Sequence, residues 1–234
     1  MGHFSATSCF IRIGRSGFLL LIALLSIPFP WNKIALAAES HRYLQQTGDE
    51  RYHFDWILDH SEGYLLRAVS EAEEHRTVMD EAMVTRRWTL TNPKDDTAVE
   101  ARREGNRIVL QGRFHGKGID KVLAIDDAPW FQSLSSSLRS FLRTPQQTTE
   151  FWTLRPDKLT VHKVRASKQG VETVDLRSQR IEANKVEVGL TGIASLLGRG
   201  RYWFRTSDRL LLHYQGPGGL AGVPATTITL QPPF

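Results

Sequence analysis

The stretch RYHFDWIL, residues 51–58, decides the fold class of this chain. Its even-numbered positions are apolar and its odd-numbered positions are mostly polar. The apolar positions are Tyr52, Phe54, Trp56 and Leu58. Successive side chains of a β-strand point to opposite faces of the sheet, so this alternation predicts a strand with one buried face.

The same two-residue alternation recurs along most of the chain. It is clear in VTRRWTL (84–90), KVEVGL (185–190) and RLLLHYQ (209–215). Turn-forming residues separate such runs, as in EGN (104–106) and SKQG (167–170). We count roughly ten to twelve strands at hairpin spacing, which favours an antiparallel sheet over βαβ units.

One segment, DDAPWFQSLSSSLRSFLRTP (126–145), breaks this pattern and predicts a helix. Asp127 is suited to cap it, Pro129 fits its first turn and Pro145 would stop it. The apolar residues at helical spacing are Phe131, Leu134, Leu138, Phe141 and Leu142. The other face is rich in serine. We therefore expect a mostly β fold: a curved antiparallel sheet or an incompletely closed β-barrel, with one short amphipathic helix on its concave face.

The N-terminus has the features of an export signal. Arg12 and Arg15 precede an apolar run at 17–29, and ALAAES follows with small residues at Ala35 and Ala37. We expect residues 1–37 to be a cleaved signal peptide, 38–49 a flexible N-terminal segment and 50–234 a single β-rich domain. The expected location is the periplasm, with membrane contact only through the signal or transiently.

Composition narrows the function further. Removing 37 residues from 234 leaves 197, which is enough for one domain with a sizeable core and contains no cysteine. That part keeps 27 of the 30 basic residues and all 25 acidic ones, because only Arg12, Arg15 and Lys33 leave with the signal. An excess of two positive charges, spread along the chain, argues against a nucleic-acid partner.

No catalytic or metal-binding motif is found. The seven histidines after residue 37 include no pair four residues apart in a predicted helix, and no HExxH or G-x-S-x-G pattern occurs. We therefore expect no metal and no cofactor, and a non-enzymatic role is favoured. A hydrolase remains the alternative, because a barrel can gather a site from separate strands; a purely structural envelope component is a further one.

The stretch RYWFRTSDRLLLHYQG (201–216) predicts a hairpin that turns at Thr206–Asp208. Arg201, Trp203 and Arg205 share one face of its first strand. The simpler interpretation is a solvated face with the indole packed between arginine stems. The alternative is a surface that binds an anion or an aromatic ligand.

An apolar or amphipathic ligand, such as a lipid, would need a cavity lined by apolar side chains. The apolar, glycine-rich segment GLTGIASLLGRG (189–200) would supply either a mobile lip or a turn that closes the sheet. The candidate ligand-binding residues are Trp56, Trp88, Leu138, Phe141, Leu196, Leu197 and Tyr214. The other candidate partner is an envelope protein.

Two stretches carry a resemblance: PWFQSLSSSLRSFLRTPQQTTEFWTLRPDKLTVHKVRA (129–166) and RYWFRTSDRLLLHYQGPGGLAGVPATTITL (201–230). Together they resemble uncharacterised exported families of bacterial envelopes, classed as domains of unknown function. The resemblance implies an extended antiparallel sheet curled around a helix, and it implies no catalytic residues. A more distant similarity of shape links such sheets to periplasmic lipoprotein carriers, which hold acyl chains in a half-barrel.

Overall fold

The computed structural model describes residues 38–60, 63–176, 179–191, 198–217 and 225–232. Within these ranges the chain forms fourteen β-strands, one 3-10 helix and one α-helix. The helices are η1 (Pro93–Asp95) and α1 (Leu134–Leu142). The strands are β1 (Glu39–Thr47), β2 (Glu50–His60), β3 (Tyr64–Val69), β4 (Glu74–Met79), β5 (Thr85–Asn92), β6 (Thr97–Glu104), β7 (Arg107–Phe114), β8 (Lys117–Ala124), β9 (Thr148–Arg155), β10 (Thr160–Leu176), β11 (Gln179–Leu190), β12 (Arg199–Arg205), β13 (Leu211–Pro217) and β14 (Ala225–Leu230).

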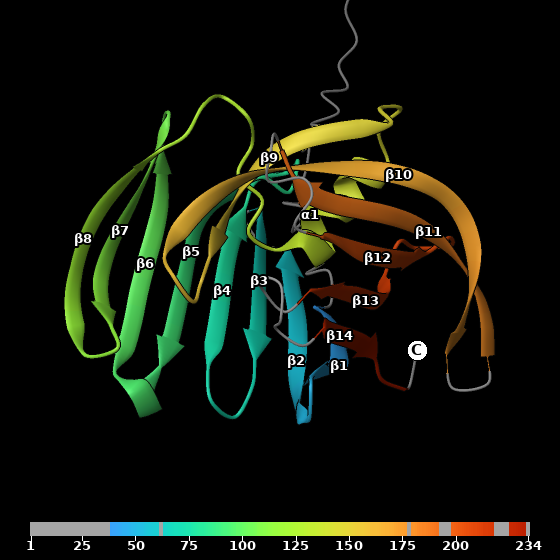
Figure 1. The fold of residues 1–234 in the computed structure, drawn as a ribbon, viewed down its shortest axis with the longest axis horizontal. Helices are drawn as coiled ribbons and strands as arrows, with labels where there is room; N and C mark the ends of the chain where they lie inside the picture. Colours follow the sequence, from blue (N-terminus) through green and yellow to red (C-terminus); the bar gives the residue numbers. More distant parts are fainter. Residues whose placement is uncertain (1–37, 61–62, 177–178, 192–197, 218–224, 233–234) are drawn as a thin grey trace, which may run out of the picture. The chain divides into compact units, whose positions relative to one another are not determined.

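All fourteen strands belong to one antiparallel sheet, in the order β8-β7-β6-β5-β4-β3-β2-β1-β14-β13-β12-β11-β10-β9 (Figure 1). The first and last strands pair in its middle, with Tyr43 opposite Leu230. The two ends of the sheet, β8 and β9, do not pair with each other. The sheet is therefore curved but not closed, which confirms the fold class expected from the alternating pattern.

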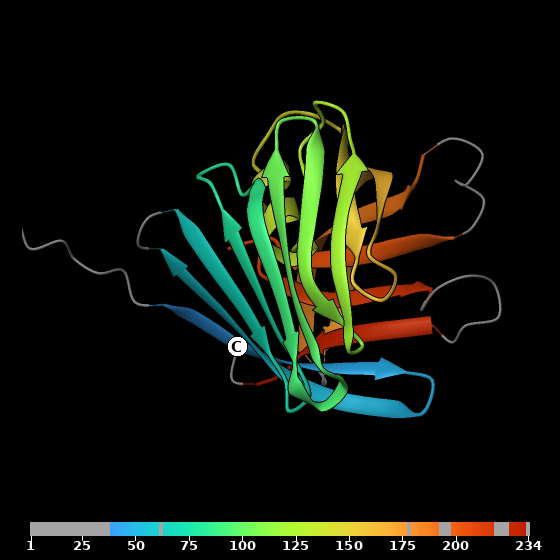
Figure 2. The same cartoon turned by 90° about the vertical axis from the view of Figure 1, so that its left-hand side faces the viewer.

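The sheet curls over itself, so that strands distant in its order face each other. In Figure 2 the strands of the β4–β8 end lie in front of the β10–β13 strands and cross them. The pairing register shifts between Val78 and Met79, between Lys168 and Gly170, and between Trp203 and Phe204. Such bulges bend a strand and increase its local twist, which helps the sheet to curl.

Two clusters of buried side chains lie on the concave side. The larger one surrounds α1 and includes Trp56, Leu138 and Phe204. The smaller one joins Trp88, Ile108 and Leu110 of β5 and β7 to Leu154 and Leu159 near β9. The β9 end of the sheet thus packs against strands β5–β7. Helix α1 packs against the other part of the concave face.

The N-terminal segment 38–49 was expected to be flexible, and that expectation is wrong. Residues 39–47 form β1, which pairs along its length with β2 and along half of it with β14. The Tyr43 side chain is only 1% exposed, and its hydroxyl donates to the Leu211 carbonyl at 2.9 Å. The polar composition of this segment suggested flexibility. Its backbone is instead held by hydrogen bonds to the two strands that flank it, β2 and β14.

The helix is shorter than its sequence pattern predicts. It begins at Leu134, with Ser133 as N-cap, so the caps assigned to Asp127 and Pro129 are wrong. Residues 129–131 instead run extended: Trp152 N donates to the Pro129 carbonyl at 2.8 Å, and Thr85 N donates to the Trp130 carbonyl at 2.9 Å. Backbone pairing with β9 and β5 thus replaces the first helical turns. Trp130 and Trp152 meet there in an isolated parallel bridge.

The serine side of α1 does not face solvent. Ser136 and Ser137 are both fully buried, and the Ser137 hydroxyl donates to the Met83 carbonyl at 2.8 Å. The Leu138 side chain is also fully buried. Because the sheet curls around α1, both sides of this short helix are enclosed, and small polar residues allow the close approach (Figure 1).

The turn predicted at SKQG does not form. Residues 160–176 make one long strand, β10, and Gly170 sits at its bulge with a φ of +99°. Glycine adopts this backbone conformation without the steric cost that other residues carry. The turn-like sequence SKQG (167–170) therefore forms a β-bulge within β10.

The compact unit that carries the sheet extends from Ala35 to Phe234. The signal peptide expected over residues 1–37 lies outside the described residues, as do Leu196 and Leu197. Of the helices in the described ranges, none has the length and apolar character needed to cross a bilayer.

Candidate ligand-binding cavity

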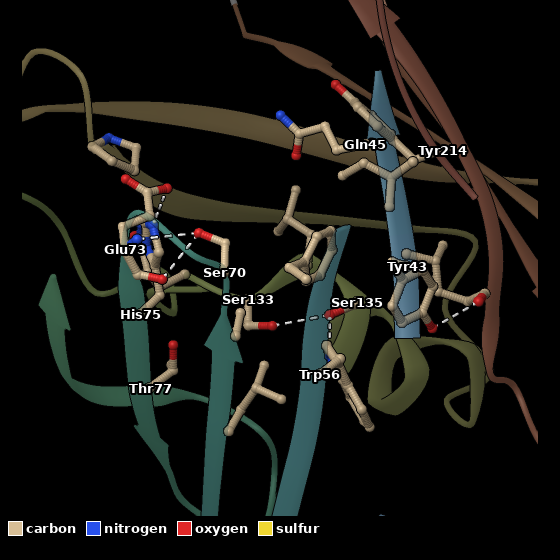
Figure 3. A pocket seen from close by; sticks show the side chains of 18 of the residues that line it. Tyr43, Gln45, Trp56, Ser70, Glu73, His75, Thr77, Ser133, Ser135 and Tyr214 are labelled. Atoms are coloured by element: carbon tan, nitrogen blue, oxygen red, sulfur yellow. Dashed lines mark hydrogen bonds and ion pairs between the residues drawn. The ribbon is translucent and has the colours of Figure 1, made fainter. Parts of the chain in front are cut away.

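A cavity of about 550 Å³ lies on the concave side of the sheet, where α1 begins. Strands β1–β4 form one wall, β12–β14 form another, and the β9–β10 turn overhangs it. Its size falls within the range of small-molecule sites, roughly 300–1,000 Å³. Figure 3 shows it from close by.

The exposure of the lining residues falls steadily along β2. Alternate side chains of this strand point into the cavity: Tyr52 is 41% exposed, Phe54 is half-buried and Trp56 is 3% exposed. Strand β4, on the far side of β3, repeats the trend, from half-buried His75 to Thr77 at 3%. We call the Tyr52 end the mouth of the cavity and the Trp56 end its floor.

The first turn of α1 forms part of the floor. The Trp56 indole Nε1 donates to the Ser135 hydroxyl at 3.0 Å, and the Ser133 and Ser135 hydroxyls lie 3.0 Å apart (Figure 3). Leu134 and Leu66 supply apolar surface beside them. The floor is thus mainly apolar, and its polar groups already bond to one another.

Gln132 ties this floor to β9. Its side-chain amide donates to the Leu154 carbonyl at 2.9 Å, while its Oε1 accepts from Leu154 N and from Trp130 Nε1, each at 3.0 Å. Its backbone N–H donates to the Thr85 hydroxyl at 3.0 Å. One residue, through its side chain and its backbone, therefore fixes the segment before α1 against two strands that are distant in the sheet.

Charge enters the lining at Glu73, one step nearer the mouth than His75, which the strand pairing places level with Trp56. The Glu73 carboxylate and the His75 Nε2 lie 2.9 Å apart, and Ser70 holds the preceding turn by accepting from Glu73 N at 3.1 Å (Figure 3). The hydrogen bond with His75 lowers the Glu73 pKa, against the effect of burial. Glu73 is therefore a carboxylate at neutral pH. Burial and the nearby Glu73 charge raise the pKa of Tyr52 to about 12.

Two tyrosines form the opposite wall. The rings of Tyr202 and Tyr214 lie 4.6 Å apart, and burial raises the pKa of both hydroxyls. Tyr214 lies close over two glycines: a Cβ at Gly216 would fall 2.3 Å from its hydroxyl, and one at Gly200 would fall 3.0 Å from its ring. The glycines thus leave the space that Tyr214 occupies.

Of the seven candidate residues, three lie together at this cavity: Trp56, Trp88 and Tyr214 line it. Leu138 and Phe141 lie in the core cluster around α1 and are not among the lining residues. Leu196 and Leu197 lie outside the described residues. Whether any of these residues binds a ligand remains a prediction.

Sequence reasoning missed several lining residues. Tyr52 and Phe54 belong to the same alternating run as Trp56, so the signal for them was present. Tyr43 was missed because its segment was assigned as flexible. Glu73 and His75 were missed because they come directly after a turn, and only the pairing of β3 with both β2 and β4 places His75 level with Trp56.

The face that holds Arg201, Trp203 and Arg205 is occupied by ion pairs. Arg205 bonds to Asp208 at 2.6 Å, which also closes the hairpin turn, and Arg201 lies 3.6 Å from Glu187. The Trp203 indole donates to Glu172. These contacts fit the simpler interpretation, in which the arginines lie on an outer face of the sheet and pair with neighbouring carboxylates.

Among the described residues, no three His, Cys, Asp or Glu side chains are grouped closely enough to hold a metal ion. The His75 ring bonds to Glu73 and lies 5.7 Å from the Trp88 ring.

Comparison with solved structures gives several matches. A β-barrel-like protein of the domain of unknown function DUF1849 from Brucella abortus superposes with a TM-score of 0.57 at 10% identity, covering 85% of this chain and 97% of its own. The hypothetical lipoprotein YmcC from Escherichia coli gives a TM-score of 0.36 at 13% identity, with 83% and 87% covered.

A DUF1329 family protein from Desulfovibrio piger gives a TM-score of 0.26 at 14% identity, with 83% of this chain and 82% of its own covered. No known family matches the sequence, and no curated protein does. The match to the DUF1849 protein shows a shared fold with a domain of unknown function, as the resemblance to exported families of unknown function implied.

Proposed function

We propose that this protein is a non-enzymatic binding protein that holds an apolar or amphipathic ligand, such as a lipid, in the cavity between its curved sheet and α1. The observation that carries the proposal is the graded lining: a mainly apolar floor at Trp56, Leu66 and Leu134 and a polar mouth at Glu73 and Gln45. Such a gradient suits a molecule with one greasy end and one polar end.

A ligand test can be built on the size of the cavity. Ala68 lines it, so Ala68→Phe would fill part of the space, whereas Ala98 is exposed on β6 and offers the matched control Ala98→Phe. The neutral dye N-phenyl-1-naphthylamine is the probe. We expect the dye fluorescence to rise when the unmodified protein or Ala98→Phe is added. We expect the affinity of Ala68→Phe for the dye to be at least about fivefold weaker.

Equal dye binding by all three proteins would contradict the proposal, as would no binding by the unmodified chain. Circular dichroism melts of each protein control for loss of fold. Native mass spectrometry after incubation with envelope lipid extract then asks which component the cavity retains. A chain that emerges with no added mass counts against lipid carriage.

The export of the protein is the second part of the proposal. It is supported by the apolar run at 17–29 and the small residues at Ala35 and Ala37. Fractionation of a bacterial host that expresses the full chain tests it. We expect the protein in the periplasm with Ala38 as its first residue, and full-length protein in the cytoplasm would contradict export.

A structural envelope role has one observation in its favour. Strand β8 is an end of the sheet, and Val122 on it is 61% exposed. Lys117, Asp120 and Lys121 put charge along the same strand, which discourages pairing with another chain. The cavity therefore supports binding of a small ligand better than β8 supports strand addition.

A further inference from the structure

We infer that the bound amphiphile enters tail first and carries an uncharged or cationic polar group, which lies at the mouth beside Glu73. This inference rests on the proposed function and adds the class of ligand. It follows from the charges of the lining residues together with the direction in which the cavity becomes apolar.

The orientation comes from the depth gradient on two strands of one wall, β2 and β4. On β2 the lining passes from Tyr52 to the buried Trp56, and on β4 it passes from His75 to the buried Thr77. Pairing of β2 with β3, and of β3 with β4, places Trp56 level with Ala68 and His75. Glu73 lies two residues before His75, one step nearer the mouth. An alkyl tail therefore buries most of its apolar surface away from water when it lies at the floor of the cavity.

The charge selectivity comes from an imbalance in the lining. Among the described residues that line the cavity, Glu73 and Asp157 are acidic and none is a lysine or arginine. Asp157 is compensated by Arg155 at 2.5 Å, whereas the partner of Glu73 is an imidazole. Asp95 adds a further negative charge within electrostatic reach of Glu73. A cationic or hydrogen-bond-donating group gains energy here, and a carboxylate or phosphate is repelled.

The N-terminus of α1 could attract an anion to the floor instead. The floor argues against that arrangement, since Ser133 and Ser135 bond to each other and to Trp56, and Leu134 and Leu66 surround them. An anionic group there would lose its water without gaining a positively charged side chain. The two arrangements differ in which charge the protein prefers, so one experiment separates them.

The experiment compares three amphiphiles with the same twelve-carbon tail, each below its micelle concentration: dodecyltrimethylammonium, dodecyl maltoside and dodecanoate. Displacement of N-phenyl-1-naphthylamine reports their affinities for the unmodified chain, Glu73→Gln and Glu73→Lys. Asp120→Lys is the control, because it makes the same change of charge on the exposed strand β8. Melting curves check that each variant folds.

We expect dodecyltrimethylammonium to bind about fivefold to tenfold more tightly than dodecanoate, and Glu73→Lys to reverse that order. Dodecyl maltoside should change little between variants, and Asp120→Lys should match the unmodified chain. Tighter binding of dodecanoate, or an order that Glu73→Lys leaves unaltered, overturns the charge selectivity while leaving the cavity a binding site. If neither the dye nor any amphiphile binds, the proposed function fails and this inference with it.

Discussion

Arg139 of α1 holds Glu39 of β1 through one nitrogen, its Nη1 donating to the two carboxylate oxygens at 3.0 and 2.9 Å. The guanidinium also lies 5.8 Å from the centre of the Trp56 ring. Arg139 is only 9% exposed, so this ion pair is largely withdrawn from water. It joins the helix to the strand in the middle of the sheet, directly behind the floor of the cavity.

Arg139→Met should destabilise the fold by about 2–3 kcal/mol, because it leaves the half-buried Glu39 carboxylate without its cation. Urea unfolding measures the change. The double variant Glu39→Gln with Arg139→Met should recover part of the loss, since no charge is then left unpaired. If the double variant loses as much unfolding free energy as the two single variants added together, or more, Glu39 and Arg139 are not coupled.

The same pair predicts the acid response of the protein. Burial opposes ionisation of Glu39, but hydrogen bonds from His41 and Arg139 prevail and lower its pKa. A carboxyl whose folded pKa is depressed adds stability above its unfolded pKa, near 4.5, and loses it as the pH falls through the folded value. Urea midpoints of the unmodified chain should therefore approach those of the single variant Glu39→Gln as the pH falls below 4.5. Parallel curves from pH 7 to pH 3 would contradict the assignment.

Leu138 decides whether α1 is part of the core or a displaceable cover. Its side chain is fully buried in the cluster around α1. Leu138→Ala should cost about 2–5 kcal/mol, and Leu138→Asp should abolish the cooperative melt, because it places a charge in an apolar site. Arg143→Asp, at the exposed end of the helix, is the control. A folded Leu138→Asp protein with increased dye binding would show instead that α1 moves aside.

Gly216 positions a wall of the cavity. Gly216→Ala places a methyl group 2.3 Å from the Tyr214 hydroxyl, a distance that forces the ring to move. We expect a loss of about 1–3 kcal/mol in stability and weaker dye binding. Gly118→Ala, whose new methyl group would meet nothing within 4 Å, should leave both unchanged. Dye binding that survives Gly216→Ala at full affinity would remove Tyr214 from the site.

The alternating run around Trp56 predicted the buried face of β2 correctly, and the hairpin at residues 201–216 forms around the Arg205–Asp208 pair. Expectations based on local polarity or turn residues were less reliable. Residues 39–47 became a strand, Gly170 became a bulge, and residues 129–131 paired with strands where a helix was expected. In each case, backbone pairing with another strand outweighed local preference.

The amino-acid sequence by itself determined that the chain is mostly β, that one short helix interrupts the strands, and that Trp56, Trp88 and Tyr214 point to the inside. These features follow from the spacing of apolar residues along a strand or helix, which is local. Only the tertiary structure decided that β1 pairs with β14, that the sheet curls over β9, and that Glu73 and His75 lie near Trp56 at one cavity. Those relationships depend on strand order and register, because contacts between residues far apart in the chain have no signature in the spacing of their neighbours.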